Sequence, residues 1–222
     1  MTCDQCRGIE GMFGRRLAER QVARYRRRGP DKTTRMLIEA LKAEGVDGLT
    51  LLDIGGGIGA IPLALLKAGV RHATDVDAST AYLAIAQSEA KREGVASRVE
   101  YRYGNFTDLA GDVAPTGIVT LDRVICCYHD MRGLVGQSVA KAATLYGLVY
   151  PRDTWWTRAV IAASNIILRL RRDPFRVFVH STEAVDALIR GSGLVQRYHR
   201  MAGAWQVVVY ARGVSEAGRA GG

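Results

Sequence analysis

The chain has 222 residues and a formal net charge of +9 at pH 7, from 31 Lys and Arg against 22 Asp and Glu. This length is enough for one α/β domain of ordinary size. No apolar run reaches the roughly 18 residues that a membrane span requires. The N-terminal residues show no apolar signal region after a basic start, so we expect a cytoplasmic protein.

The positive charge is concentrated in two parts of the chain, residues 1–30 and 150–200. Basic surfaces attract nucleic acid, anionic membranes or anionic small molecules. A solvated surface accounts for the same charge, and both interpretations stay open.

Two amphipathic helices are predicted ahead of the first strand, over residues 9–28 and about 32–44. In the first of them an apolar or amide side chain recurs every four residues from Ile9 to Tyr25, and Gly29-Pro30 ends it. Strand and helix patterns then alternate, which predicts a parallel, doubly wound sheet. The expected strands are 50–54, 72–77, 99–103, 117–122 and 145–150, and the expected helices are 60–68, 79–94 and one that ends over 140–144.

The C-terminal part has a different pattern. A helix over 182–190 precedes two strands, 195–200 and 205–211, with only a short turn at Gly203 between them. Strands joined so closely pair antiparallel. The small and polar tail, residues 214–222, is expected to fray.

The stretch from Asp53 to Gly59 combines the end of an apolar strand, a glycine-rich turn and the start of a helix. Such a turn admits a nucleotide-like cofactor. The spacing Gly55-x-Gly57-x-x-Ala60 satisfies the dinucleotide fingerprint. The spacing Asp53-x-Gly55-x-Gly57-x-Gly59 resembles motif I of the class I S-adenosylmethionine (SAM)-dependent methyltransferases. An acid at the end of the strand suits the ammonium and sulfonium groups of SAM better than it suits the pyrophosphate of a dinucleotide. The antiparallel hairpin favours SAM as the cofactor.

This resemblance implies an α/β fold, a doubly wound, Rossmann-like seven-stranded sheet with a terminal antiparallel hairpin. It implies an N-terminal helical cap over residues 1–46 and a SAM-binding methyltransferase domain over 47–213. An insert on the acceptor side occupies residues 151–180 of that domain.

The resemblance also assigns cofactor contacts. Asp77 ends the second strand, where the family's acid binds the ribose hydroxyls; a helix-capping turn is the alternative. Asn105 stands where the family has an acid that binds the adenine amino group, and its amide oxygen can accept the same bond. The predicted cofactor-binding residues are Asp53, Gly55, Gly57, Gly59, Asp77, Asn105, Phe106 and Asp122. Core packing of Phe106 and pairing of Asp122 with Arg123 are the alternatives.

Tyr128 and His129 follow the fourth strand and are the candidate acid–base groups. A lone His is also common on surfaces and in cores. Transfer of a methyl group from SAM is a direct in-line displacement, so the main tasks of the protein are alignment and exclusion of water. An amine or hydroxyl acceptor would need a base, with His129 as the first candidate, whereas a carboxylate is already ionised at neutral pH.

The segment from Tyr150 to Arg176 resembles the corresponding insert of the magnesium-protoporphyrin IX methyltransferases. It predicts an apolar acceptor pocket with basic residues near it, and hence a small, largely apolar acceptor, of which a carboxylated one is a favoured case. The residues expected to line this pocket are Tyr25, Arg152, Trp155, Trp156 and His180. An apolar helical face flanked by Arg also suits peripheral contact with an anionic membrane.

Cys3 and Cys6 have the spacing of zinc ligands, but the other two cysteines, Cys126 and Cys127, are adjacent and complete a four-ligand site poorly. We therefore expect no metal. Two other functions stay open: a basic, inactive relative that binds RNA or an anionic membrane, and a nicotinamide-dependent reductase. We expect no nucleic acid partner because no platform of interleaved aromatic residues is evident. The sequence leaves the oligomeric state open.

Overall fold

The computed structural model describes residues 4–213 of the chain, with side chains from Gly8 onward. Cys3, the side chain of Cys6 and the tail predicted to fray lie outside the described residues. The helices are α1 (Asp4–Met12), α2 (Arg15–Arg28), α3 (Lys32–Glu44), α4 (Ala60–Lys67), α5 (Thr80–Arg92), α6 (Phe106–Leu109), α7 (Met131–Val139), α8 (Trp155–Leu170) and α9 (Thr182–Gly191). The strands are β1 (Thr50–Ile54), β2 (His72–Asp77), β3 (Val99–Tyr103), β4 (Thr116–Asp122), β5 (Ala142–Pro151), β6 (Leu194–Ala202) and β7 (Trp205–Arg212).

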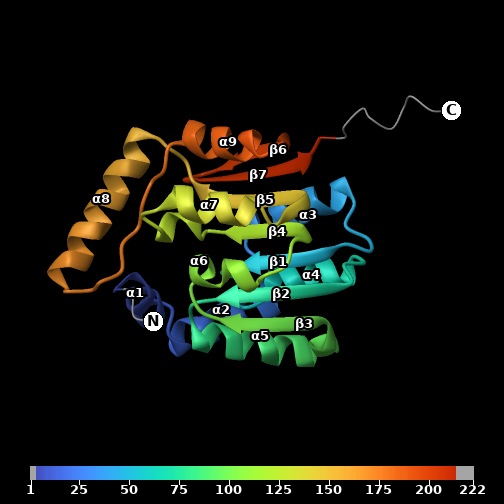
Figure 1. Ribbon diagram of the computed structural model, residues 1–222. Coiled ribbons are helices and arrows are strands. Elements are labelled where there is room, and N and C mark those ends of the chain that lie inside the picture. Colours follow the sequence, from blue (N-terminus) through green and yellow to red (C-terminus); the bar gives the residue numbers. More distant parts are fainter. Residues whose placement is uncertain (1–3, 214–222) are drawn as a thin grey trace.

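The strands form one seven-stranded sheet in the order β3-β2-β1-β4-β5-β7-β6 (Figure 1). The first five are parallel, whereas β7 pairs antiparallel with both β5 and β6. The order reverses between β1 and β4, and ligands of open α/β sheets bind at such a switch point, beyond the carboxyl ends of the strands. The predicted fold, including the terminal hairpin, is confirmed.

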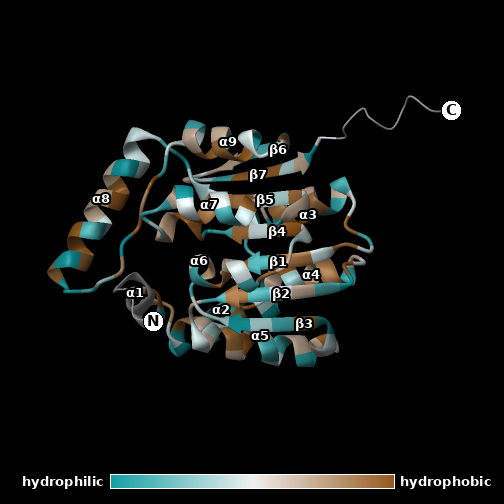
Figure 2. Ribbon diagram, viewed as in Figure 1, coloured by the Kyte–Doolittle hydropathy of each residue, from teal (hydrophilic) through white to brown (hydrophobic). Residues whose placement is uncertain are grey.

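Neighbouring residues of a strand point to opposite faces of the sheet, so both faces carry apolar side chains. Helices cover each face with their own apolar side chains. Leu51 of β1 belongs to a buried cluster with α3 and α4, whereas Leu52 belongs to a second cluster with α7 and α9. The two apolar layers hold the strand ends, and hence the polar residues at those ends, in fixed positions (Figures 1 and 2).

Two predicted boundaries differ from the structure. The helix expected over residues 9–28 is two helices, α1 and α2, since Gly14 takes an extended conformation (φ −79°, ψ 173°) between them. Residues 140–144 do not end a helix: α7 stops at Val139, and β5 already begins at Ala142. The β-propensity of the Thr and Tyr residues in this segment prevails over the short helical pattern.

None of the helices within residues 4–213 has the length and apolar character needed to cross a membrane.

Candidate active site

The glycine-rich turn between β1 and α4 depends on backbone conformations that other residues avoid. Gly55, Gly57 and Gly59 have φ values of +67°, +60° and +80°. A Cβ atom on Gly55 would lie 2.5 Å from Cγ2 of Val124. The turn therefore requires glycine at Gly55 for two reasons, its positive φ and the close approach of the segment after β4.

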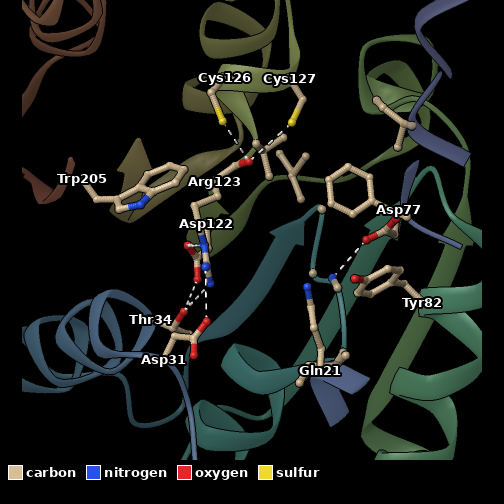
Figure 3. Close-up of a pocket in the computed structure, with 18 of the residues that line it drawn as sticks. Gln21, Asp31, Thr34, Asp77, Tyr82, Asp122, Arg123, Cys126, Cys127 and Trp205 are labelled. Carbon is tan, nitrogen blue, oxygen red and sulfur yellow. Dashed lines mark hydrogen bonds and ion pairs between the residues drawn. The ribbon is translucent and has the colours of Figure 1, made fainter. Parts of the chain in front are cut away.

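Asp77 fastens this turn to the end of β2. The Gly57 N–H donates to Oδ2 of Asp77 at 3.0 Å (Figure 3), and the Ser79 N–H donates to Oδ1 at 2.8 Å. Burial raises the pKa of Asp77, and the bonds from Gly57 and Ser79 oppose that shift. The carboxyl group lies in the wall of the large cavity described below.

Two further carboxyl groups lie beneath the turn. Asp53 of β1 and Asp75 of β2 are partners in the strand register, and both are buried. The Thr120 hydroxyl donates to Oδ1 of Asp53 at 2.6 Å, while Oδ2 of Asp53 has no hydrogen-bond partner among the described residues. Burial raises the pKa of Asp53 to about 8, and the nearby Asp122 and Asp77 add to the shift. The pKa of Asp75 is raised by burial and by Asp53.

We expect the stability of the ligand-free protein to fall as the pH rises. Asp53 ionises with a pKa near 3.8 when unfolded but about 8 when folded, so the folded state holds the extra proton between those values. This contribution is complete below about pH 4 and is lost as the pH rises through about 8. In Asp53→Asn, which keeps the acceptor for Thr120, the melting temperature should gain on the wild type progressively from pH 5 to pH 8.

The matched control is Asp108→Asn, at an exposed carboxyl group on α6. A difference between Asp53→Asn and the wild type that does not change with pH would contradict the raised pKa.

A network of charged and hydroxyl groups joins the end of β4 to the start of α3. The Thr34 hydroxyl donates to Asp122 Oδ2 at 2.5 Å, and the Arg123 guanidinium donates to Asp122 Oδ1 at 3.0 Å and to Asp31 Oδ2 at 3.3 Å. Arg24 of α2 pairs with the other oxygen of Asp31 at 2.7 Å. The guanidinium of Arg123 lies 5.9 Å from the ring centroid of Trp205 (Figure 3). These contacts bring two arginines and an aromatic ring to the switch point of the sheet.

A cavity of about 600 Å³ lies above the turn and the strand ends. Its roof comes from distant parts of the chain: the Phe13 ring packs edge-on against Tyr82 and Phe175, with centroids 5.9 and 5.6 Å apart. The Ser79 hydroxyl donates to the Phe13 carbonyl at 2.8 Å, which fixes the end of α1 over the β2 end. One side of α8 forms a further wall. The cavity therefore has a polar end at the glycine turn and an aromatic end under α2 and α8.

Most of the residues predicted for the site line this cavity: Tyr25, Asp53, Gly55, Gly57, Asp77, Phe106, Asp122, Tyr128 and Trp156. Gly59 is not part of the cavity wall. It is the N-cap residue of α4 and has a left-handed backbone conformation.

Two of the predicted polar residues are held elsewhere by hydrogen bonds. The amide oxygen of Asn105 accepts the hydroxyl of Tyr128, and its amide nitrogen donates to the Thr107 hydroxyl at 2.7 Å. Nε2 of His180 lies 2.9 Å from the carbonyl oxygen of Ile125 and 2.8 Å from that of Tyr128. His180 thus fastens the segment before α9 to the one after β4, outside the cavity wall.

Three more predicted residues also lie outside the cavity wall. His129 is exposed and contacts the Phe178 ring, with centroids 6.5 Å apart. Arg152 donates to the Gly203 carbonyl at 3.2 Å, at the rim of the sheet. Trp155 is 82% exposed, because adjacent residues of a helix are turned by about 100° and Trp156 takes the inward direction.

Sequence reasoning missed several residues of the wall, above all Tyr82, Phe13 and Trp205. The hydroxyl of Tyr82 is buried without a hydrogen-bond partner among the described residues, and burial raises its pKa to about 12. No local pattern singles these residues out, since they meet only through tertiary packing. Together with the free oxygen of Asp53, the Tyr82 hydroxyl gives a bound molecule two buried polar groups to satisfy.

The part of the chain that the structure describes contains no cluster of three or more His, Cys, Asp or Glu side chains arranged to hold a metal ion.

Comparison with known proteins finds methyltransferases by sequence and by structure. The family model described as the methyltransferase small domain matches residues 20–120. The chain is 33% identical over 78 residues to the ribosomal protein L11 methyltransferase of Deinococcus radiodurans, and 29% identical over 117 residues to that of Edwardsiella ictaluri. These matches cover 35% and 50% of this chain, but only 29% and 40% of the length of those relatives.

Solved structures match over more of the chain. The magnesium protoporphyrin IX methyltransferase of Synechocystis, crystallised with bound S-adenosylhomocysteine (SAH), superposes with a TM-score of 0.69 at 15% identity and covers 89% of this chain and 96% of its own. An O-methyltransferase family protein from Burkholderia thailandensis superposes with a TM-score of 0.64 at 17% identity, over 92% of this chain and 64% of its own. This chain therefore shares the fold of the class I SAM-dependent methyltransferases, and the segment around its glycine turn matches a methyltransferase family model.

Proposed function

We propose that this chain transfers a methyl group from SAM to a small, largely apolar acceptor that carries a carboxylate. One observation supports this proposal above the others: a single cavity joins the glycine turn and Asp77 to an aromatic chamber with two arginines in its wall. Its volume of about 600 Å³ is in the range of small-molecule sites.

The polar end of the cavity suits the cofactor. Asp77 has carboxylate lone pairs left for ribose hydroxyls, and the turn offers backbone without side chains above it. Asp53 Oδ2 and the Tyr82 hydroxyl are buried polar atoms that a polar ligand would satisfy, since such atoms seldom stay unpaired. When bound, SAM supplies a methyl group on a sulfonium, which an acceptor attacks in line.

The aromatic end suits the acceptor. Tyr25, Trp156 and Trp205 give it flat apolar walls, and Arg24 and Arg123 place guanidinium groups at its edge, held there by Asp31 and Asp122. A carboxylate would pair with such guanidinium groups. Because it is already ionised, it needs no general base, and the exposed position of His129 is compatible with that.

The residues of the chain then have two tasks, alignment and exclusion of water. The network of Asp122, Arg123 and Asp31 fixes the chamber floor, and the roof around Phe13 and Phe175 covers the cofactor end. The relatives found by sequence are named as methyltransferases of ribosomal protein L11, so a protein acceptor is the second candidate. An acceptor chamber under α2 and α8 favours the small molecule.

The test has two stages. Calorimetry with SAH and with NADH identifies the cofactor, and micromolar binding of SAH alone is the expected result. Transfer of a labelled methyl group is then measured with porphyrin and aromatic carboxylates, the matching phenols, and purified ribosomal protein L11. Labelling of a carboxylate supports the proposal, whereas labelling of the protein alone, or binding of NADH alone, contradicts it.

The two adjacent tryptophans of α8 provide a matched pair of variants. Trp156→Ala should raise the KM for the acceptor about tenfold, since it removes an aromatic wall worth roughly 1–1.5 kcal/mol, and should leave SAH affinity unchanged. Trp155→Ala removes the same side chain from the solvent side and should change neither quantity. Equal effects of the two variants on the KM would contradict the assignment of Trp156 to the acceptor chamber.

A further inference from the structure

Helix α8 carries a strip of exposed apolar side chains along its outer side. Trp155 and Leu170, at the two ends of the helix, are 82% and 80% exposed, and Val160, Ile166 and Ile167 between them are 51–60% exposed. At about 100° per residue, these five side chains fall on one continuous sector of the helix, with the exposed Ala159 and Ala163 between them. The name outer strip is used below for these seven residues.

The opposite side of α8 holds the helix on the protein. Ile161 and Ser164 line the cavity from this side. The Asn165 amide donates to the Val177 carbonyl at 2.7 Å and accepts the Val177 N–H at 3.0 Å. The helix therefore has a fixed orientation with the outer strip turned away from the sheet, and Figure 1 shows it projecting from the body of the molecule.

Arginines flank the strip, and no acidic residue interrupts it. Arg158 and Arg169 fall beside it on the helix, and Arg171 and Arg172 follow at its end, whereas residues 154–172 contain no Asp or Glu. Asp153, just before the helix, is paired with Arg158 at 2.5 Å. Figure 2 shows the resulting alternation of hydrophobic and hydrophilic bands along α8.

We propose that the outer strip docks on an anionic lipid bilayer, with α8 lying in the plane of the interface. Apolar side chains with an aromatic residue enter the boundary of the acyl chains, and flanking arginines meet anionic headgroups. A helix of 16 residues is about 24 Å long, short of the roughly 30 Å hydrocarbon core, so it lies on the bilayer and does not cross it. A second copy of the chain would bring the same arginines against one another, which disfavours a chain–chain contact at this strip.

The strip is also continuous with the cavity. Val160 belongs to the outer strip and to the cavity wall, so apolar surface runs unbroken between them. A lipid-soluble acceptor would thus reach the aromatic chamber from the bilayer, a consequence that rests on the proposed function. Docking itself does not depend on it, because vesicle binding is measured without cofactor or acceptor.

The experiment is cosedimentation of the full chain with vesicles of phosphatidylcholine alone and of phosphatidylcholine mixed equally with phosphatidylglycerol. Binding to the mixed vesicles that weakens with salt is expected. Trp155→Ser/Leu170→Ser should lower the partition coefficient at least about tenfold. The matched control is Val195→Ser/Met201→Ser, which removes two exposed apolar side chains from the edge strand β6 and should bind like the wild type. Equal SAH binding by both variants establishes that both are folded.

A second pair of variants tests the charge. Arg171→Gln/Arg172→Gln should weaken binding to the mixed vesicles about 30-fold, at about 1 kcal/mol per arginine near the surface. Arg16→Gln/Arg20→Gln, on α2, makes the same change in net charge and should have a smaller effect. If the two pairs of arginine substitutions weakened vesicle binding equally, binding would depend on net charge alone, and the proposal would be overturned.

Two further outcomes would overturn it. One is binding of Trp155→Ser/Leu170→Ser that matches the wild type. The other is a wild-type protein that does not bind vesicles and is a dimer by light scattering, whereas Trp155→Ser/Leu170→Ser is a monomer. The outer strip would then be covered by a second chain.

Discussion

Asp77→Asn is expected to weaken SAH binding about 100-fold, since a carboxylate that accepts two ribose hydroxyls contributes roughly 1.5–3 kcal/mol per charged hydrogen bond. The same change leaves one acceptor oxygen for the two N–H groups of Gly57 and Ser79, which loosens the glycine turn from the end of β2. Isothermal calorimetry with SAH measures the affinity.

The matched control is Asp108→Asn, at an exposed carboxyl group of α6 near the same edge of the sheet. This variant should bind SAH like the wild type. Circular dichroism compares the folds, so that lost affinity in Asp77→Asn is attributed to the site and not to unfolding. An affinity within about threefold of the wild type for Asp77→Asn would remove Asp77 from the cofactor site.

Gly55→Ala is expected to destabilise the protein by about 3 kcal/mol and to abolish SAH binding. The positive φ of +67° costs a residue with a Cβ roughly 1–2 kcal/mol, and the contact with Val124 Cγ2 at 2.5 Å adds a similar amount. For a chain of this length the melting temperature should fall by roughly 6–12 °C.

A double variant separates the two causes. In Gly55→Ala/Val124→Ala the obstructing methyl group is gone but the backbone strain remains, so about half of the lost melting temperature should return. Gly111→Ala is the control, because this glycine lacks a positive φ and a Cβ there meets nothing within 4 Å. Wild-type stability of Gly55→Ala would show that the turn differs from the structure described.

The strands and the glycine turn of the cavity were predictable because their signals are local. Each parallel strand is a short apolar run, and the acid and glycines of the turn follow β1 directly in the sequence. The terminal hairpin follows from the short connection at Gly203. Such features need only neighbours in the chain, so spacing and composition reveal them.

The aromatic walls of the cavity were less predictable, because distant residues build them. Phe13, Tyr82 and Phe175 meet only in the folded chain. The sequence placed both Trp155 and Trp156 in the pocket, and the helix turns one of them away. The sequence predicted Asn105 as the adenine contact, yet its amide oxygen accepts the hydroxyl of Tyr128, a partner 23 residues further along.

The position of β7 in the sheet has a consequence for synthesis of the protein. β6 leaves the ribosome before β7, yet β7 lies between β5 and β6 and is the strand with which β6 pairs. Until Trp205–Arg212 emerge, β5 presents an open edge and Leu194–Ala202 has no partner in the sheet. The nascent chain therefore carries unpaired strand edges until β7 has emerged, and this is the stage at which this sheet is most open to aggregation and most dependent on chaperones.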